Sequence, residues 1–227
     1  IEEKGRVVMY YYTCGQRKMT KRNILYFDKV LDYSFAQDGS LIVLAGVKDG
    51  QSDIFVHNIA SGTNFQVTND KADDYYPRFI NNGKQIIFSS NRSSDTLSVE
   101  EERAQRGFTH DLFIYDYERK SDKLMRLADS KYIRKTQPFE VGANKFISLN
   151  DANGIVNRHF SEFDSTISYV DTTVHYRHFA LTNPITNYSR NIIEQDYNET
   201  SNLLSEVVYK DGKYFMYVNG FDEEIEP

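Results

Sequence analysis

The chain has 227 residues, of which 40% are hydrophobic and 26% charged. This composition is that of an ordinary globular protein and argues against wholesale disorder. Acidic residues exceed basic ones by 33 − 27 = 6, and no stripe of Lys and Arg is present, so we expect no nucleic-acid partner. No apolar run approaches the roughly 18 residues of a membrane-spanning helix, so we do not expect this segment itself to cross a membrane.

Aromatic and cysteine content narrow the fold class. The chain has 17 Tyr and 15 Phe but no Trp, and many of these rings stand beside β-branched residues. That mixture suits the pleated, half-buried surface of a sheet and favours an all-β fold. The single cysteine, Cys14, cannot form an internal disulfide, which is compatible with either a reducing or an oxidising compartment.

A repeated hairpin is the strongest local signal. Residues 33–46 and 77–90 each read as a short strand, a tight turn and an apolar strand, with Asp38-Gly39 and Asn82-Gly83 at the turns. Asp-Gly and Asn-Gly between apolar runs predict β-hairpins, because both central turn positions favour a positive φ.

Two further strands follow each hairpin. Residues 53–59 and 111–117 match closely, and each begins with an aspartate, Asp53 or Asp111. Residues 65–68 and 125–128 then supply a fourth short strand. The turn glycines Gly39 and Gly83 lie 83 − 39 = 44 positions apart, close to the spacing of roughly 40 to 50 residues in propeller blades. We therefore predict an all-β fold of four-stranded antiparallel blades, a β-propeller.

The rest of the chain fits the repeat less closely. Residues 138–149 predict a third hairpin, 153–164 a third strand and 172–195 a long, decorated fourth strand. Residues 206–218 predict a last hairpin around Asp211-Gly212, and residues 7–13 and 23–28 predict the closing strands of an earlier blade. The expected organisation is a blade end at 6–30, regular blades at 31–70 and 74–130, an elaborated blade at 135–198, and a blade start at 203–227.

These blades do not close a ring. An open propeller exposes strand edges and an apolar flank, which are an aggregation liability. The sequence also begins at Ile1 and not at Met. We therefore expect the chain to be part of a larger propeller, completed by further blades of the same polypeptide or by a partner chain.

An insertion at 93–107 separates the second and third strands of the second regular blade. Its residues predict a short helix near 98–106, with Ser98 as a capping candidate, acidic residues early and arginine late. Loops on a rigid scaffold often carry binding. We therefore take five insertion residues as candidate partner contacts: Glu100, Glu101, Glu102, Arg103 and Arg106.

The sequence offers no catalytic constellation. No G-x-S-x-G elbow, H-E-x-x-H pair, P-loop or dinucleotide fingerprint occurs, so we expect no enzyme activity, no catalytic residue and no cofactor in this segment. The acidic runs 70–74 and 150–153 do not fit a calcium loop and are interpreted as turns. His175 and His178 stand three apart on a predicted strand, where side chains alternate, so we expect no metal site. The recurring aspartates and turn residues are expected to be structural.

The repeat resembles the WD40-like repeat of TolB-type propellers. The residues that carry the resemblance are FAQDGSLIVLAG and SDIFVHNIASG in one blade, and RFINNGKQIIFSSNR and HDLFIYD in the next. The match covers about residues 32–130 and fades afterwards, where the segments look like those of large envelope proteins of gliding Gram-negative bacteria. The resemblance implies a periplasmic or outer-membrane-associated propeller that docks other envelope proteins.

Three functions are compatible with these observations. The first is a non-enzymatic protein-binding or scaffold module of a larger cell-envelope protein, linked to an outer-membrane transport or secretion assembly. The second is the regulatory propeller of a multidomain hydrolase such as a peptidase. The third is a carbohydrate-binding propeller, suggested by the many tyrosines whose rings could stack on sugars.

Overall fold

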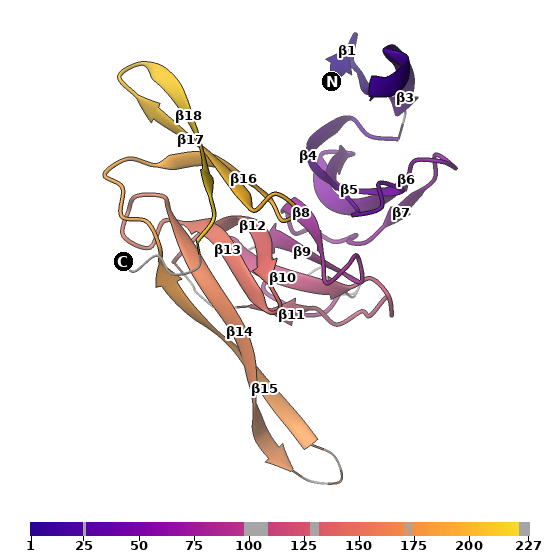
Figure 1. Ribbon diagram of the computed structural model, residues 1–227. Helices are drawn as coiled ribbons and strands as arrows, with labels where there is room; N and C mark the ends of the chain where they lie inside the picture. Colours follow the sequence, from indigo (N-terminus) through magenta and orange to yellow (C-terminus); the bar gives the residue numbers. More distant parts are fainter. Residues whose placement is uncertain (25, 98–108, 128–131, 171, 173, 223–227) are drawn as a thin grey trace.

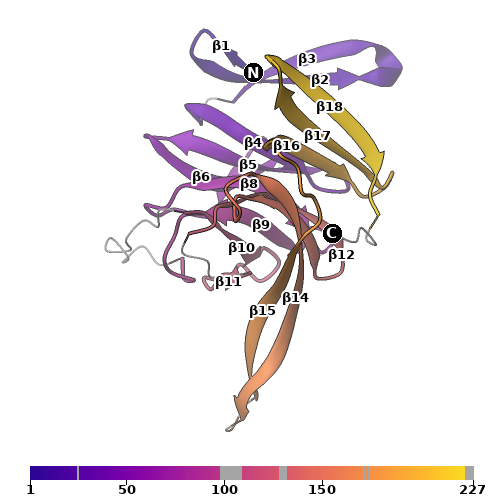
Figure 2. The same cartoon turned by 90° about the vertical axis from the view of Figure 1, so that its left-hand side faces the viewer.

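The computed structural model describes residues 1–24, 26–97, 109–127, 132–170, 172 and 174–222, without the side chains of 13, 14, 165–170 and 174–179. Within these residues the chain forms five antiparallel sheets arranged in an arc (Figures 1 and 2). The first sheet comprises β1 (Glu2–Glu3), β2 (Arg6–Thr13) and β3 (Lys18–Ile24), with the short 3-10 turn η1 (Cys14–Gln16) between the last two.

The three middle sheets have four strands each. The second sheet comprises β4 (Lys29–Phe35), β5 (Leu41–Lys48), β6 (Gln51–Asn58) and β7 (Asn64–Gln66). The third comprises β8 (Asp74–Ile80), β9 (Gln85–Ser90), β10 (Asp111–Asp116) and β11 (Met125–Arg126). The fourth comprises β12 (Lys135–Gly142), β13 (Lys145–Asn150), β14 (Asn157–Val170) and β15 (Val174–Pro184). In each, strands adjacent in sequence are adjacent in space, as in a propeller blade.

The fifth sheet corrects the predicted boundary of the elaborated blade. It comprises β16 (Ile192–Asn198), β17 (Leu203–Lys210) and β18 (Lys213–Gly220). The interval 172–195 was predicted to be one fourth strand, but β15 ends at Pro184 and β16 pairs with β17. At the other end of the chain, β3 begins at Lys18, five residues before the predicted start at residue 23. The strand that pairs with β2 therefore lies earlier than predicted.

Four hydrophobic clusters hold the sheets face to face, one at each interface between neighbouring sheets. For example, Val43 and Ile54 of the second sheet pack with Phe88 and Phe113 of the third. The clusters at the other interfaces are built around Phe55, Ile87 and Ile147. β5 and β6 are buried on both of their faces, which explains why they read as continuous apolar runs and not as alternating ones.

One glycine is required by this packing. A Cβ atom added to Gly46 of β5 would lie only 2.6 Å from Cδ1 of Phe27. The absence of a side chain at Gly46 therefore lets the Phe27 ring lie against the second sheet. Phe27 is buried and contacts Phe55 edge to face at 4.7 Å between ring centroids, so it closes the interface between the first two sheets.

The two outermost sheets expose apolar side chains. Every residue of β18 is exposed, including Met216 at 72% and Val218 at 55%. Tyr12 and Met19 are exposed at 56% and 62% in the first sheet. An interior sheet is covered on both faces by its neighbours, whereas these two have a neighbour on one side only (Figure 1). The arc thus ends in apolar surface at both ends.

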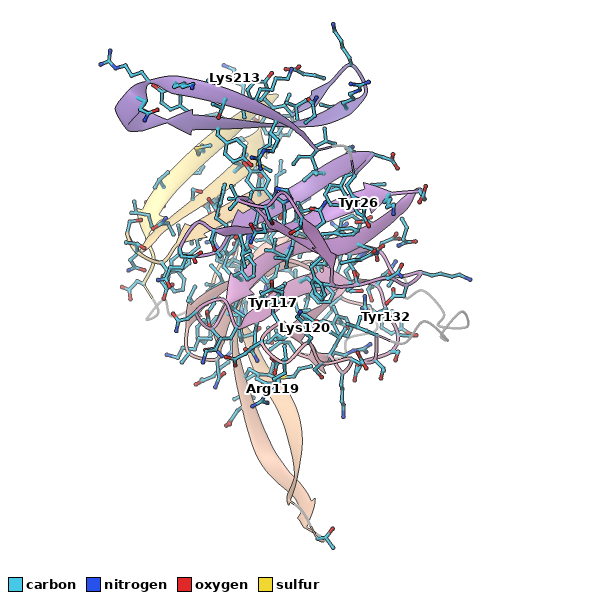
Figure 3. The ribbon with its side chains drawn as sticks, turned by 90° about the vertical axis from the view of Figure 1, so that its right-hand side faces the viewer. Tyr26, Tyr117, Arg119, Lys120, Tyr132 and Lys213 are labelled. Carbon is cyan, nitrogen blue, oxygen red and sulfur yellow. The ribbon has the colours of Figure 1, made fainter. Side chains whose placement is uncertain are left out.

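A long hairpin, β14–β15, projects away from the arc (Figure 3). Only residues 157–162 of β14 pair with β13, and from Phe163 onward β14 pairs with β15 alone. His175 and His178 lie on this ribbon, and their side chains fall outside the described part of the chain. Among the described residues no helix is long and apolar enough to cross a membrane.

A buried ionic cluster, formed by Asp53, Asp70, Asp74 and Arg92, links the second and third sheets. Nη2 of Arg92 donates to both oxygens of Asp74 at 2.8 and 3.1 Å, and Nη1 donates to Asp70 at 3.0 Å. The pKa of Asp53 is raised to about 7, mainly by burial and also by the neighbouring charges of Asp74 and Asp70, while a hydrogen bond from Thr68 opposes the rise. The acidic run 70–74, interpreted as a turn, thus holds Arg92 in place.

Asp53 gives the protein an unusual dependence of stability on pH. Because the folded pKa of about 7 lies above the ordinary aspartate value of 3.8, Asp53 contributes stability that is fully present below pH 3.8 and is lost as pH rises through 7. We expect Asp53→Asn to match the wild type near pH 4 and to be more stable by roughly 1–3 kcal/mol at pH 8, measured by urea unfolding. For Asp38→Asn the change in stability relative to the wild type should have the opposite dependence on pH, because hydrogen bonds from Ser40 lower the pKa of Asp38. An Asp53→Asn variant whose advantage is the same at both pH values would contradict this account.

Candidate functional site

The first strands of four sheets surround a central cavity. β4 contacts β8, β8 contacts β12 and β12 contacts β16, so these strands form the inner edges of their sheets. Together with the turns that follow them they line a cavity of about 840 Å³. This volume lies in the range of small-molecule and side-chain binding sites, roughly 300–1,000 Å³. We refer to it below as the central cavity.

Each of the four lining strands carries a register shift. The shifts fall between Val30 and Asp32 in β4, between Tyr75 and Arg78 in β8, after Thr136 in β12 and between Ile192 and Glu194 in β16. A β-bulge bends its strand and redirects the side chains that follow it. The bulges therefore place charged residues, Asp32, Arg78 and Glu194 among them, on the wall of the central cavity.

The cavity wall is strongly acidic. Five carboxylates line it, and Arg78 is the one basic side chain among the lining residues. Nη1 of Arg78 donates to Oδ2 of Asp32 at 2.6 Å, and its guanidinium lies 4.7 Å from the ring centroid of Phe139. Arg78 thus joins the second, third and fourth sheets. The other four carboxylates have no cationic partner in the wall: Glu140, Glu194, Asp196 and Glu199.

The acidic residues differ in their exposure. Oε2 of Glu140 accepts a hydrogen bond from the backbone N–H of Asn81 at 2.7 Å. Burial raises the pKa of Glu140, and the neighbouring charge of Glu199 adds to this effect while the Asn81 hydrogen bond opposes it. Glu194, Asp196 and Glu199 are exposed to solvent. A cavity lined by charges of one sign concentrates its electrostatic field and attracts ligands of the opposite sign.

Aromatic rings lie among the carboxylates. Tyr33 and Phe35 of β4 are more than half exposed, and their ring centroids lie 6.0 Å apart. Phe79, Phe139 and Tyr197 complete the aromatic part of the wall. Ring faces attract ammonium and guanidinium groups within about 6 Å. The central cavity therefore combines the two features that recognise a Lys or Arg side chain, carboxylates and exposed rings.

The structure places most of the predicted turn residues as expected and differs at one. Asn82-Gly83 and Asp211-Gly212 have positive φ at both positions. Gly39 has a φ of 69°, but Asp38 does not adopt a positive φ. Instead Oδ1 of Asp38 accepts a hydrogen bond from the backbone N–H of Ser40 at 2.9 Å, so this turn differs from the expected pattern.

The two repeat aspartates have different partners. Asp53 accepts hydrogen bonds from Gln66 and Thr68 of its own sheet. Asp111 accepts one from Nζ of Lys135, which lies on β12 of the next sheet, at 3.1 Å. Both are buried, and their hydrogen bonds link neighbouring segments; a structural role for the repeat aspartates stays a prediction.

The candidate contacts in the insertion lie outside the described residues. This applies to Glu100, Glu101, Glu102, Arg103 and Arg106, and to the helix expected at 98–106. The start of the insertion is described: Thr96 forms an isolated bridge with Lys123, and the backbone N–H of Leu97 donates to the carbonyl of Asp122. The insertion thus leaves the third sheet beside its outer strand.

The central cavity was not identified from the sequence, because no single segment contains it. Each first strand, together with the turn that follows it, contributes only one to three charged residues to the wall, and the arc brings them together. A usable signal was nonetheless present: all four segments place a charged residue in the strand that precedes a tight turn, namely Asp32, Arg78, Glu140 and Glu194.

Comparison with known proteins identifies the fold. No family model and no curated protein matches the sequence. Among solved structures, TolB from Acinetobacter baumannii is 12% identical with a TM-score of 0.62 over 88% of this chain and 43% of that one. A putative TolB from Agrobacterium tumefaciens is 16% identical with a TM-score of 0.67 over 96% and 70%. The tricorn protease is 12% identical with a TM-score of 0.57 over 95% and 23%.

The fold is therefore that of a β-propeller. Within that class it resembles the TolB-type propeller, as the repeat predicted. This chain spans less than half of the Acinetobacter protein. At these identities the likeness concerns the fold, and function has to be argued from the residues of the site.

Proposed function

We propose that the chain is a non-enzymatic, protein-binding propeller module of a larger bacterial cell-envelope protein. In this proposal the central cavity is the partner-binding site, and it receives a Lys or Arg side chain from an exposed segment of the partner. The observation that carries the proposal is the cavity wall, with five carboxylates against one arginine and with exposed rings beside them.

The cellular setting is proposed on the basis of the resemblance to TolB-type propellers. That resemblance supports a periplasmic or outer-membrane-associated location and a link to a transport or secretion assembly. Nothing in the cavity requires a cofactor for binding, because carboxylates and rings act directly on a cationic side chain.

Completion of the ring is the second part of the proposal. The exposed Met216 and Val218 at one end of the arc and Tyr12 and Met19 at the other are apolar surface of the kind that interior sheets bury. We propose that further blades cover these two faces, supplied by the same polypeptide. Five insertion residues remain proposed contacts to other envelope proteins: Glu100, Glu101, Glu102, Arg103 and Arg106.

A second candidate is the propeller of a multidomain peptidase. The similarity to the tricorn protease favours it, although that likeness covers 23% of the protease chain. In that setting the central cavity would admit a basic peptide to a catalytic domain elsewhere. The chemistry of the cavity would be the same, and only the fate of the bound peptide would differ.

The binding proposal is tested with two short peptides of equal length, one carrying three lysines and the other three glutamates. We expect fluorescence anisotropy to show saturable binding of the lysine peptide only. That binding should weaken when salt is raised from low to physiological concentration, because exposed charges are then screened over about 8–10 Å. Equal binding of both peptides, or binding of neither, would contradict the proposal.

A further inference from the structure

A second cavity lies between the fourth and fifth sheets. Its volume is about 590 Å³, and it shares no lining residue with the central cavity. Its wall comes from the start of β14, the segment after β15, the middle of β17 and the end of β18. We call it the lateral pocket.

The wall of the lateral pocket is held in place by a buried asparagine. Asn157 is fully buried, and its Oδ1 accepts hydrogen bonds from Oγ1 of Thr186 at 3.0 Å and from the backbone N–H of Tyr188 at 2.8 Å. Its Nδ2 donates to the carbonyl of Tyr188 at 3.3 Å. The segment after β15 is therefore fixed against β14, and the pocket is preformed.

The charges at the base of the pocket cancel. Nη2 of Arg158 donates to Oε2 of Glu206 at 2.6 Å, and the hydroxyl of Tyr188 donates to Oε1 of Glu206 at 2.9 Å. Arg158 and Glu206 are the only charged side chains in the lining. The lateral pocket therefore has no net charge, in contrast to the central cavity, and favours a neutral ligand.

Several hydrogen-bonding groups in the pocket remain open. Arg158 is only 4% exposed, and its Nε donates to Gln195. Its Nη1 has no hydrogen-bond partner among the described residues. The side-chain amides of Asn187 and Asn219 likewise have none within the described part of the chain. Nη1 is not among the buried polar atoms that lack a partner, so it keeps accessible surface and can donate to a ligand in the pocket.

The remaining wall is apolar. Ile185, Leu204 and Phe221 line the pocket beside the open amides. An amide donates and accepts hydrogen bonds at adjacent atoms, as neighbouring hydroxyls do. A ligand that fits must therefore be neutral, rich in groups that both donate and accept, and partly apolar on one face.

We propose that the lateral pocket binds a neutral carbohydrate, as one sugar unit of a glycan. The ring hydroxyls accept from Nη1 of Arg158 and exchange hydrogen bonds with the amides of Asn187 and Asn219. The C–H face of the sugar packs on the apolar wall. This site is independent of the central cavity and of the protein partner proposed for it.

The test uses methyl glycosides of glucose, galactose, mannose and N-acetylglucosamine as probes. We expect saturation-transfer NMR with the whole chain to show saturable binding of at least one, with a dissociation constant of roughly 1 mM. Asn187→Ala and Asn219→Ala should each weaken it about threefold to tenfold, the effect of one or two net hydrogen bonds. The side chains of Asn187 and Asn219 are exposed and make no hydrogen bond to the described residues, so the two variants should fold.

The matched control is Asn69→Ala, an exposed asparagine outside both cavities, which should bind as the wild type does. The proposal is overturned if none of the four glycosides binds saturably. It is also overturned if a bound glycoside is unaffected by Asn187→Ala and Asn219→Ala, or is lost in the central-cavity variant Asp196→Asn.

Discussion

Replacing Arg92 with methionine is expected to destabilise the protein by about 3–5 kcal/mol, the largest effect of any single charge change proposed for this chain. The guanidinium makes hydrogen bonds to Asp74, Asp70 and Ser90, and Asp74 is completely buried. Removing Arg92 while keeping its volume leaves those carboxylates without a counter-charge between two sheets. Urea unfolding at pH 7 measures the loss.

The stability loss of Arg92→Met should depend on pH. Burial raises the pKa of Asp74, and Arg92 opposes that effect. Without Arg92 the carboxyl should bind a proton more readily, so the deficit of Arg92→Met should shrink as pH falls towards 5. Arg92→Lys keeps the charge but not the planar guanidinium, so its stability should lie between those of the wild type and Arg92→Met. A loss below about 1 kcal/mol for Arg92→Met would contradict the role given to the cluster.

Replacing Phe55 with alanine is expected to cost about 3–5 kcal/mol through the cavity it leaves. Phe55 is fully buried, and its ring lies 4.7 Å from Phe27 and 5.7 Å from Tyr26, measured between centroids. Because these rings close the interface between the first two sheets, the first sheet should become the first part of the protein open to proteolysis. Thermal unfolding and limited proteolysis measure the two effects.

The matched control for Phe55 is another phenylalanine of the same sheet. Phe65 lies on β7, is 36% exposed and has its ring 6.2 Å from that of Tyr117. Phe65→Ala should cost about 1 kcal/mol or less, since little volume is lost from the core. If the two alanine variants are equally destabilised, the interface assigned to Phe55 is wrong.

The second and third sheets could be predicted from the sequence because their signals are local. Gly39 and Gly83 mark tight turns, and the apolar runs around Val43 and Phe113 are buried on both faces. The turn residues and the buried apolar runs lie within a few residues of each other, and both indicate the same strands. These sheets also carry the repeat by which the TolB-type resemblance was recognised.

The strand Ile192–Asn198 could not be placed from the sequence. It lies at the inner edge of its sheet, buries only Ile192 and Gln195 in an irregular pattern, and is interrupted by a bulge after Ile192. Such a strand has neither a continuous apolar run nor a strict alternation. Its assignment to the fifth sheet depends on pairing with β17, which is a tertiary contact.

The central cavity could not be predicted for a related reason. Asp32 and Arg78 stand 46 positions apart, and their ion pair exists only because two sheets pack side by side. The sequence places Arg78 on a predicted strand and Asp32 just before one, but it does not show the side to which a bulge turns each side chain. The site is therefore a property of the arc and not of any one repeat.

We propose that the acidic wall of the central cavity recognises a cationic segment. The most direct measurement compares two triple variants of equal charge in the lysine-peptide anisotropy assay. One carries Glu194→Gln, Asp196→Asn and Glu199→Gln, which neutralise the exposed carboxylates of the cavity. The other carries Glu2→Gln, Asp49→Asn and Glu118→Gln, which neutralise three exposed carboxylates elsewhere. We predict that the cavity variant binds at least about tenfold more weakly than the wild type while the other stays within about twofold. Equal losses in the two variants would show that net charge alone attracts the peptide, and would contradict the claim.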